Sequence, residues 1–364
     1  MTTLEERSFD YDNNGKQKTT CYLTGGPENG PLMVFVHGWP AIGKVWTPQL
    51  QTFSSLGFKV VAPDMPGYGK STADKDLDDY TQENINLGML ALLDHLGRDQ
   101  AIWIAHDWGC GAAWSFAAHY PSKCLAVACL TIPYRSVELG LEQLVDHGIN
   151  RSIYPADEYP YGQWDYQHFY ETSFERASEF FDANCAAFLK VGYSKGDSAN
   201  FGKVAFTANV SRDGGWLGGD GKKLQKMAED MPLEDTVLDE ETYTALVEAM
   251  QRTGFWGADA WYANHARNRK YTLEKSTNNG DLHMPILFIH ARFDSVCATT
   301  TTPGMCKPMR RHCRDLTEVS IDAGHWVAEE KPAEVSAAIA RWLVERCKEQ
   351  WPGFWANGHV RRTT

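Results

Sequence analysis

Residues 101–111 read AIWIAHDWGCG: five apolar residues, a tight turn around Asp107, and the start of a helical pattern that continues to His119. A short run that is apolar on both faces is typical of a buried parallel strand. A strand that passes directly into a helix through such a turn presents the central side chain at the end of the sheet. The small residues Ala105, Gly109 and Gly111 fit this geometry, because the helix and the strand must pass closely.

Short apolar runs of the same kind recur along the chain and predict the strands of a sheet: Leu32–Val36, Lys59–Ala62, Ala101–Ala105, Leu125–Ile132, Pro285–His290 and Glu318–Ile321. Residues 8–24 predict two further strands, joined by the turn formers at 13–15. Helical patterns lie between the runs, at Thr81–Leu96, Gly109–His119 and Ala333–Cys347. This alternation predicts a parallel sheet with helices on both faces.

The alternation stops between about Tyr134 and Ala258, in a segment rich in aromatic residues and helix formers. We interpret it as a helical cap that is inserted into one α/β core and covers the carboxyl ends of the strands. The predicted division is core at 1–133, cap at 134–258 and core again at 259–364. A glycine-rich loop at 214–219 belongs to the cap and is expected to be flexible.

The bulk composition excludes several kinds of partner. The chain has 364 residues and a net charge of −12, so neither nucleic acid nor an anionic membrane surface is expected to bind it. Its longest apolar runs have the length of strands, so no membrane span is expected. The polar start lacks the apolar run of a signal peptide, and the odd number of nine cysteines suits reduced thiols. We therefore expect a cytoplasmic protein.

No cofactor or metal is expected. In the loop at 214–219 a phosphate-binding pattern would need Gly and Ser or Thr where Trp216 and Lys223 stand. No G-x-G-x-x-G motif follows the first strand, and no C-x-x-C pair suggests zinc.

Asp107 occupies the place that serine hydrolases give to serine, and this changes the chemistry. Serine attack on an sp³ carbon would leave an ether, which the enzyme could not hydrolyse. A carboxylate leaves an ester instead, and water can then attack the carbonyl carbon of the aspartate itself. Asp107 therefore predicts an alkyl-enzyme intermediate, with an epoxide or an alkyl halide as electrophile. The alternative is that Asp107 only caps the following helix.

Two further residues follow later strands in the chain order nucleophile, acid, histidine. His325 lies on the loop after Glu318–Ile321, where it suits a general base that activates water. Asp294 follows Pro285–His290 and is placed to orient the imidazole and stabilise its charged form.

An oxyanion hole is predicted from His37-Gly38-Trp39-Pro40, which follows the strand Leu32–Val36. The backbone N–H groups of Trp39 and Trp108 would hold the negative charge that develops on the ester. Pro40 favours a cis bond that aims Trp39 inward. His37 is expected to be hydrogen-bonded within the turn and to have no role as acid or base.

At these motifs the chain resembles the soluble epoxide hydrolases of the α/β-hydrolase fold family, over about residues 7–348. The matching motifs are H-G-W-P at 37–40, H-D-W-G at 106–109 and D-A-G-H-W at 322–326. The resemblance implies an α/β class with a mostly parallel eight-stranded sheet flanked by helices and a mainly helical cap inserted after strand 6. The phosphatase domain that precedes this core in some animal relatives is expected to be absent, because the α/β core begins almost at once.

The resemblance also implies two cap tyrosines that hydrogen-bond the epoxide oxygen. One is Tyr166, in the sequence W-D-Y-Q at 164–167, and the other is Tyr262, in W-Y-A-N at 261–264. Phenols, with an ordinary pKa of about 10, can polarise the oxygen and supply a proton when the ring opens. Tyr170 is the alternative to Tyr166, since it follows one helical turn later.

Two other functions stay open. Haloalkane dehalogenases share H-D-W-G, although they often have Asn where Trp39 stands. A non-catalytic receptor with the same fold is the third candidate, but receptors need not keep a triad. The aromatic cap residues favour a lipophilic or aromatic epoxide, with water as co-substrate: Trp164, Phe169, Phe174, Phe180, Phe181 and Trp216. The sequence leaves the oligomeric state open, including whether the aromatic stretch Trp351–Trp355 docks on the core or on another subunit.

Overall fold

One eight-stranded sheet forms the centre of the computed structural model, which describes residues 3–352. Its spatial order is β1-β2-β4-β3-β5-β6-β7-β8, and only the β1–β2 and β2–β4 pairs are antiparallel. The predicted mostly parallel sheet is therefore confirmed. The strands are β1 Glu5–Asn13, β2 Lys16–Gly25, β3 Leu32–Val36, β4 Lys59–Pro63, β5 Ala101–His106, β6 Cys124–Leu130, β7 Leu282–Ala291 and β8 Cys313–Ile321.

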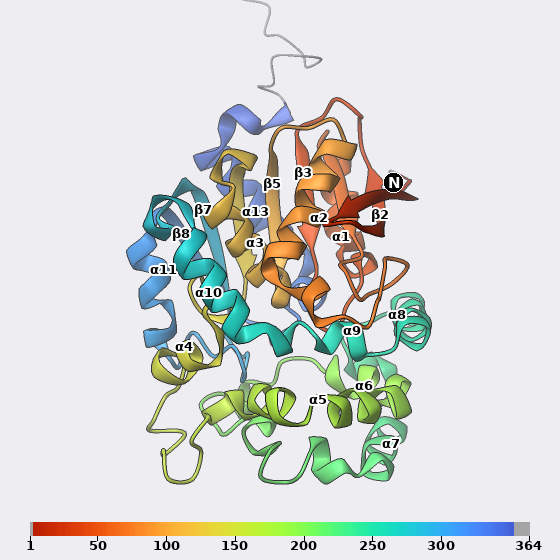
Figure 1. The fold of residues 1–364 in the computed structure, drawn as a ribbon, viewed down its shortest axis with the longest axis vertical. Coiled ribbons are helices and arrows are strands. Elements are labelled where there is room, and N and C mark those ends of the chain that lie inside the picture. Colours follow the sequence, from red (N-terminus) through yellow and green to blue (C-terminus); the bar gives the residue numbers. More distant parts are fainter. Residues whose placement is uncertain (1–2, 353–364) are drawn as a thin grey trace, which may run out of the picture.

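Helices flank the sheet and fill the long connection between β6 and β7 (Figure 1). They are α1 Thr47–Ser55, α2 Gln82–His95, α3 Trp108–His119, α4 Gly140–His147, α5 Asp165–Ala183, α6 Cys185–Gly192, α7 Gly221–Asp230, α8 Glu240–Thr253, α9 Trp256–Asp259, α10 His265–Lys275, α11 Lys307–His312, α12 Val327–Glu330 and α13 Pro332–Arg346. Within residues 3–352, none of them combines the length and the apolar character that crossing a membrane requires.

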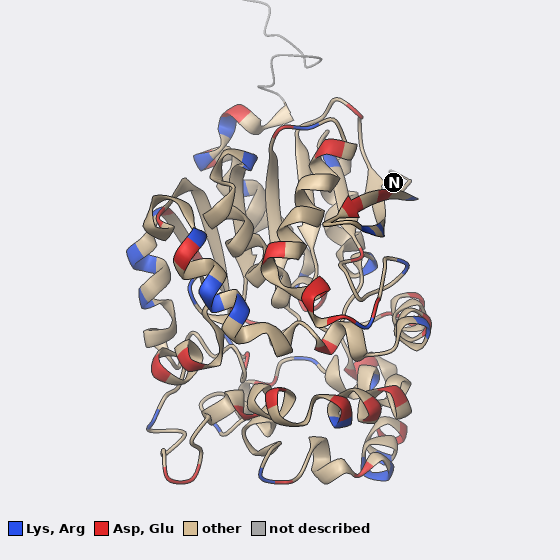
Figure 2. Cartoon of the chain, viewed as in Figure 1, with Lys and Arg blue, Asp and Glu red and all other residues tan. Residues whose placement is uncertain are grey.

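The central strands are apolar because both of their faces are covered. Every residue of β3, β4 and β5 is buried. In Figure 2 the central strands carry almost no charge, whereas red and blue lie on the outer helices and loops. Burial of this apolar surface is the main driving force that holds the helices to the sheet.

Several predicted strand ends differ from the structure by a few residues, and two of these differences have a physical reason. The run Leu125–Ile132 was expected to be one strand, but β6 stops at Leu130, because Thr131 has a φ of +74° and turns the chain away. Glu318–Ile321 is only the last part of β8, which begins at Cys313. The first half of this edge strand, residues 313–317, is mostly polar and only partly buried, so it contains no apolar run that the sequence could show.

The connection at 131–281 contains no strand, and its helices α5, α6 and α7 gather beyond the strand ends, in the lower part of Figure 1. Helix α10 returns to the core and packs beside α2 and α3. The insertion after strand 6 is thus confirmed. The division at residues 134 and 258 stays a prediction.

The aromatic C-terminal stretch is only partly described. The Trp351 ring packs edge-on against Phe58 of the core, at 5.5 Å between centroids. The remaining aromatic residues of that stretch, Phe354 and Trp355, lie outside the described residues.

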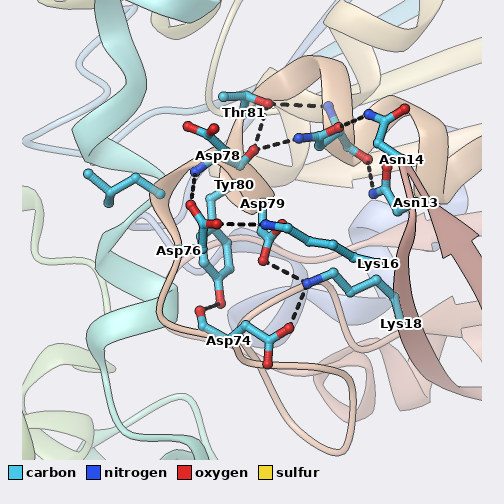
Figure 3. A network of polar contacts seen from close by, with 12 residues as sticks. Asn13, Asn14, Lys16, Lys18, Asp74, Asp76, Asp78, Asp79, Tyr80 and Thr81 are labelled. Atoms are coloured by element: carbon cyan, nitrogen blue, oxygen red, sulfur yellow. Dashed lines mark hydrogen bonds and ion pairs between the residues drawn. The ribbon is translucent and has the colours of Figure 1, made fainter.

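A network of charged side chains fastens the β1–β2 hairpin to the segment before α2 (Figure 3). The Lys18 ammonium is 2.6 Å from both Asp74 and Asp79, and its side chain is only 6% exposed. Lys16 bridges Asp76 at 2.6 Å and Asp79 at 2.8 Å. The hydrogen bond from Lys16 lowers the pKa of Asp76. Two lysines therefore compensate the buried negative charge of Asp79.

We predict that Lys18→Met destabilises the fold by about 3 kcal/mol, since it leaves a buried carboxylate with one cation instead of two. The measurement is the free energy of unfolding in urea at neutral pH. Lys226→Met is the matched control, because Lys226 pairs with Asp230 at 2.6 Å but is 67% exposed. An exposed pair is worth roughly 0–1 kcal/mol. Equal effects of the two substitutions would contradict the prediction.

Candidate active site

Asp107 lies between β5 and α3 with φ +53° and ψ −129°, a conformation that non-glycine residues rarely adopt. Backbone and side-chain atoms approach this turn so closely that only glycine fits at positions 38 and 109. A Cβ on Gly109 would come within 2.3 Å of the Val36 carbonyl oxygen, and one on Gly38 within 2.4 Å of Asp107 Oδ1. The side chain of Asp107 makes no capping bond to α3, so the helix-cap alternative is wrong for this geometry.

The Asp107 carboxylate is buried and held from two sides. The backbone N–H of Trp39 donates to Oδ1 at 2.7 Å, and His325 Nε2 is 3.5 Å from Oδ2. Burial alone would raise the pKa of Asp107, but the hydrogen bond and charge of His325 outweigh it and lower that pKa. The carboxyl group is therefore ionised, which is the form that a nucleophile requires.

One of the two predicted oxyanion donors is in contact with Asp107. The Trp39 N–H is hydrogen-bonded to it, whereas the Trp108 N–H makes no hydrogen bond to its side chain. The Trp39–Pro40 peptide bond is cis, as the sequence favoured. The Pro40 carbonyl accepts a hydrogen bond from the Tyr193 hydroxyl at 2.7 Å.

Asp294 orients His325. The imidazole Nδ1–H donates to Asp294 Oδ2 at 2.7 Å, and Asp294 Oδ1 accepts from the N–H groups of Val296 and Cys297 at 2.9 and 2.8 Å. Burial would lower the pKa of His325, but Asp294 and Asp107 raise it well above its ordinary value. In the resting state the imidazole is consequently a cation between two carboxylates.

Two other histidines support the site as neutral groups. His106 Nε2–H donates to the His325 carbonyl at 2.8 Å and so fixes the loop that carries the imidazole. His37 accepts from the Met65 N–H at 2.9 Å through Nε2, and its Nδ1–H donates to the Gly38 carbonyl at 2.9 Å. Burial lowers the pKa of each to about 4. The expectation for His37 agrees with these contacts, whereas the role of His106 was missed, although it directly precedes Asp107.

The tyrosines differ in their access to the cavity above Asp107. Tyr166 and Tyr262 line the cavity, and Tyr170 does not. Their rings lie 5.7 Å apart, while Tyr170 stacks on Tyr262 at 4.5 Å with its hydroxyl buried and unpartnered. The amide of Gln167 donates to the Tyr166 hydroxyl at 3.1 Å, which the sequence did not indicate. Of the two candidates for the first donor, the geometry favours Tyr166.

The cavity has a volume of about 780 Å³ and lies between the strand ends and the inserted helices. Of the six aromatic cap residues that favoured a lipophilic or aromatic epoxide, Phe180 and Trp216 line the cavity and the other four do not. Phe188 and Phe206 line it instead, which the sequence did not indicate. Gly215 and Gly218 place the glycine-rich loop at the cavity wall.

Two groups of side chains within residues 3–352 bring possible metal ligands within 4.8 Å of one another. In the first, Glu318 already accepts from Arg310 at 2.8 to 3.2 Å and from His290 at 3.1 Å. The second consists of Asp294, Cys297 and His325, of which Asp294 and His325 are bonded to each other. The imidazole and carboxylate atoms of both groups are thus already hydrogen-bonded within the protein.

A comparison with protein families matches residues 31–332 to the alpha/beta hydrolase fold. The chain therefore belongs to the α/β-hydrolase fold family. Within this family, it is 28% identical over 316 residues to the mouse bifunctional epoxide hydrolase 2, covering 86% of this chain and 52% of that relative. It is 26% identical over 335 residues to epoxide hydrolase A of Mycobacterium tuberculosis, covering 88% and 92%.

A solved structure of epoxide hydrolase A from Mycobacterium thermoresistibile superposes with a TM-score of 0.71 at 25% identity, covering 94% of this chain and 98% of that one. The resemblance to epoxide hydrolases inferred from the motifs is thus confirmed. The chain spans about half the length of its mouse, pig and rat relatives.

We predict that Asp107→Asn lowers the pKa of His325, because it removes one of the two carboxylates that raise it. The measurement is an NMR pH titration of the imidazole protons. A raised pKa means that protonation favours the folded state, so this contribution to stability is full below about pH 6.5 and declines as the pH rises through the folded value. The unfolding midpoint of the variant should accordingly depend less on pH above about 6.5.

Asp322→Asn is the control for this substitution. Asp322 lies on the same loop as His325, is 63% exposed and pairs with Arg292 at 3.3 Å. It should leave the titration of His325 unchanged. An equal shift in both variants, or none in Asp107→Asn, would contradict the electrostatic assignment.

Proposed function

We propose that this chain hydrolyses epoxides to vicinal diols, with Asp107 as the nucleophile. The observation that carries the proposal is that the carboxyl group of Asp107, 3.5 Å from His325 Nε2, lines one cavity together with Tyr166 and Tyr262. Most members of the family have serine at this turn. A carboxylate nucleophile beside two phenols is instead suited to attack on an sp³ carbon whose leaving oxygen needs a proton.

In the first step, the Trp39 N–H holds Oδ1 of Asp107, and Oδ2 attacks an epoxide carbon. The C–O bond of the ring breaks, and the developing alkoxide takes a proton from Tyr166 or Tyr262. Burial raises the pKa of both phenols, so each is protonated at neutral pH and available as a donor. The product of this step is an ester between Asp107 and the opened substrate.

In the second step, His325 becomes a base. The ester carries no negative charge, so one of the two carboxylates that raise the pKa of His325 is lost, and the imidazolium can return a proton to the tyrosinate. Neutral His325 then takes a proton from water, whose oxygen attacks the Asp107 carbonyl carbon. The Trp39 N–H, and in our proposal that of Trp108, stabilise the oxyanion. Collapse expels the diol, and the proton of the new carboxyl group passes to its alkoxide.

A dehalogenase would use the same nucleophile, but a halide leaves without a proton. The two phenols at the cavity wall therefore favour an epoxide over an alkyl halide. Phe180, Phe188 and Trp216 in that wall support a lipophilic or aromatic substrate, and about 780 Å³ suits a molecule of drug size.

We further propose that residues 134–258 act as the cap that closes the cavity. We also propose a cytoplasmic location, because all nine cysteines are free thiols, eight of them buried.

The proposed activity is tested with a panel of epoxides from styrene oxide to stilbene oxide, and with the matched bromide 2-bromoethylbenzene. We expect diol from at least one epoxide and no comparable halide release. Halide without diol would replace the proposal with dehalogenation, and neither product would favour a receptor.

We predict that a single turnover in heavy-oxygen water labels the Asp107 carboxylate and leaves the first diol unlabelled, because the diol oxygen comes from Asp107. Mass spectrometry of the digested protein and of the diol measures both. His325→Gln should accumulate the ester, whereas Asp107→Ala should form none. Label in the first diol would show that Asp107 acts only as a base.

We predict that Tyr166→Phe and Tyr262→Phe each slow ester formation by about a hundredfold, the lower range for general acid catalysis, since the other phenol remains. Rapid-quench detection of the ester in a single turnover measures this rate. Tyr170→Phe is the matched control, because Tyr170 does not line the cavity. A larger loss from Tyr170→Phe than from Tyr166→Phe would reverse the assignment of the first donor.

A further inference from the structure

Asp259 is a fully buried carboxyl group at the end of α9, outside the triad. Its Oδ1 accepts from the indole Nε1–H of Trp39 at 2.8 Å, and its Oδ2 lies 2.8 Å from Ser178 Oγ. It forms no ion pair with any residue in 3–352. Burying a carboxyl group without a neighbouring cation costs free energy, so packing alone does not explain the presence of Asp259 at this position.

The two N–H groups of Trp39 donate to two different carboxyl groups. The backbone N–H holds Asp107 at 2.7 Å, and the indole N–H holds Asp259. The indole is packed edge-on against Tyr262, at 5.7 Å between centroids. Because the hydrogen bond to Asp259 fixes the side-chain rotamer of Trp39, it also limits the freedom of the peptide unit that contacts the nucleophile.

Asp259 joins this residue to both elements that carry the tyrosines. Ser178 belongs to α5, which carries Tyr166 in its first turn and is kinked at Ser173, between these two residues. Tyr262 follows Asp259 by three residues, in the 3₁₀ turn Tyr262–Asn264. One carboxyl group therefore connects the donor to Asp107 with the two segments that supply the phenols.

The hydrogen bonds around Asp259 are complete if it is a neutral acid. Trp39 donates to Oδ1 in either protonation state, and Ser178 Oγ donates to Oδ2 at 2.8 Å when the group is a carboxylate. In the neutral acid this second bond reverses, so that the Asp259 hydroxyl donates to Ser178 Oγ and Ser178 donates to the Phe174 carbonyl oxygen 3.4 Å away. Burial, the largest influence, raises the pKa of Asp259 well above its ordinary value, which supports this state. An asparagine would reproduce the same pattern, with its amide oxygen toward Trp39 and its NH₂ toward Ser178.

We propose that Asp259 is a positioning residue that acts through Trp39, holding the Trp39 N–H on Asp107 and aligning the segments of Tyr166 and Tyr262 with it. This inference rests on the proposed epoxide hydrolysis. The hydrolysis of the ester depends most on the Trp39 N–H, because negative charge then develops on the oxygen that it contacts.

The test compares Asp259→Leu and Asp259→Asn by rapid-quench measurement of ester formation and ester hydrolysis, with the epoxide from the panel that the unmodified chain turns over fastest. Asp259→Leu should slow ester hydrolysis by about tenfold to a hundredfold and so accumulate ester. Asp259→Asn should keep both rates at those of the unmodified chain. Unchanged rates in folded Asp259→Leu, or slow hydrolysis in folded Asp259→Asn, would overturn the proposal.

Trp39→Phe removes the donor of the hydrogen bond between Trp39 and Asp259. It therefore still tests the proposal if Asp259→Leu does not fold. It keeps the backbone N–H, removes the indole N–H, and should also slow ester hydrolysis. In a double-mutant cycle, Asp259→Leu should add little to Trp39→Phe. Unaffected hydrolysis in Trp39→Phe, or full additivity, would contradict the proposed route.

Glu138→Leu is the matched structural control. Glu138 is as fully buried as Asp259, but its carboxylate accepts from the backbone N–H groups of Arg135 and Ser136 and contacts no site residue. Its loss should lower stability without changing the ratio of the two rates. If the unmodified chain makes no diol at all, the proposed function fails; if it does and the ratio is constant across the variants, only the role of Asp259 fails.

Discussion

The left-handed backbone at Asp107 is the constraint on which the remaining arrangement depends. A φ of +53° turns the chain from β5 into α3 so sharply that the carboxylate projects beyond the sheet. The fully buried strands around it hold this strained residue in place, since relaxing it would require repacking of the core. The close approach that follows leaves room only for glycine at positions 38 and 109.

Electrostatic compensation then determines what the carboxylate can do. In a buried site an isolated charge would be neutralised, but the His325 imidazolium and the Trp39 N–H keep Asp107 ionised. Asp294 in turn keeps His325 charged. These groups come from loops after β3, β5, β7 and β8, and the parallel sheet brings them together because its strands end at one edge. When the nucleophile becomes an ester, the same coupling releases the base.

The inserted helices add what the core lacks. They bring two phenols to the cavity and cover the nucleophile from solvent, which strengthens every charge interaction inside. Polar contacts align these helices with the core, among them the buried contact of Asp259 with Trp39 and Ser178 and the hydrogen bond from Tyr193 to Pro40. A hydrogen bond in an apolar setting is specific because leaving either partner unpaired is costly.

The sequence by itself determined the local features. Apolar runs, small residues at the turn and the order of Asp107, Asp294 and His325 predicted the sheet, the elbow and the triad, because these depend on short-range periodicity and strand ends. Tertiary structure alone decided the rest. Tyr166 and Tyr170 lie one turn apart, and only the packing of α5 places the first at the cavity. The contact between Trp39 and Asp259 joins residues 220 positions apart, a proximity that no local pattern encodes.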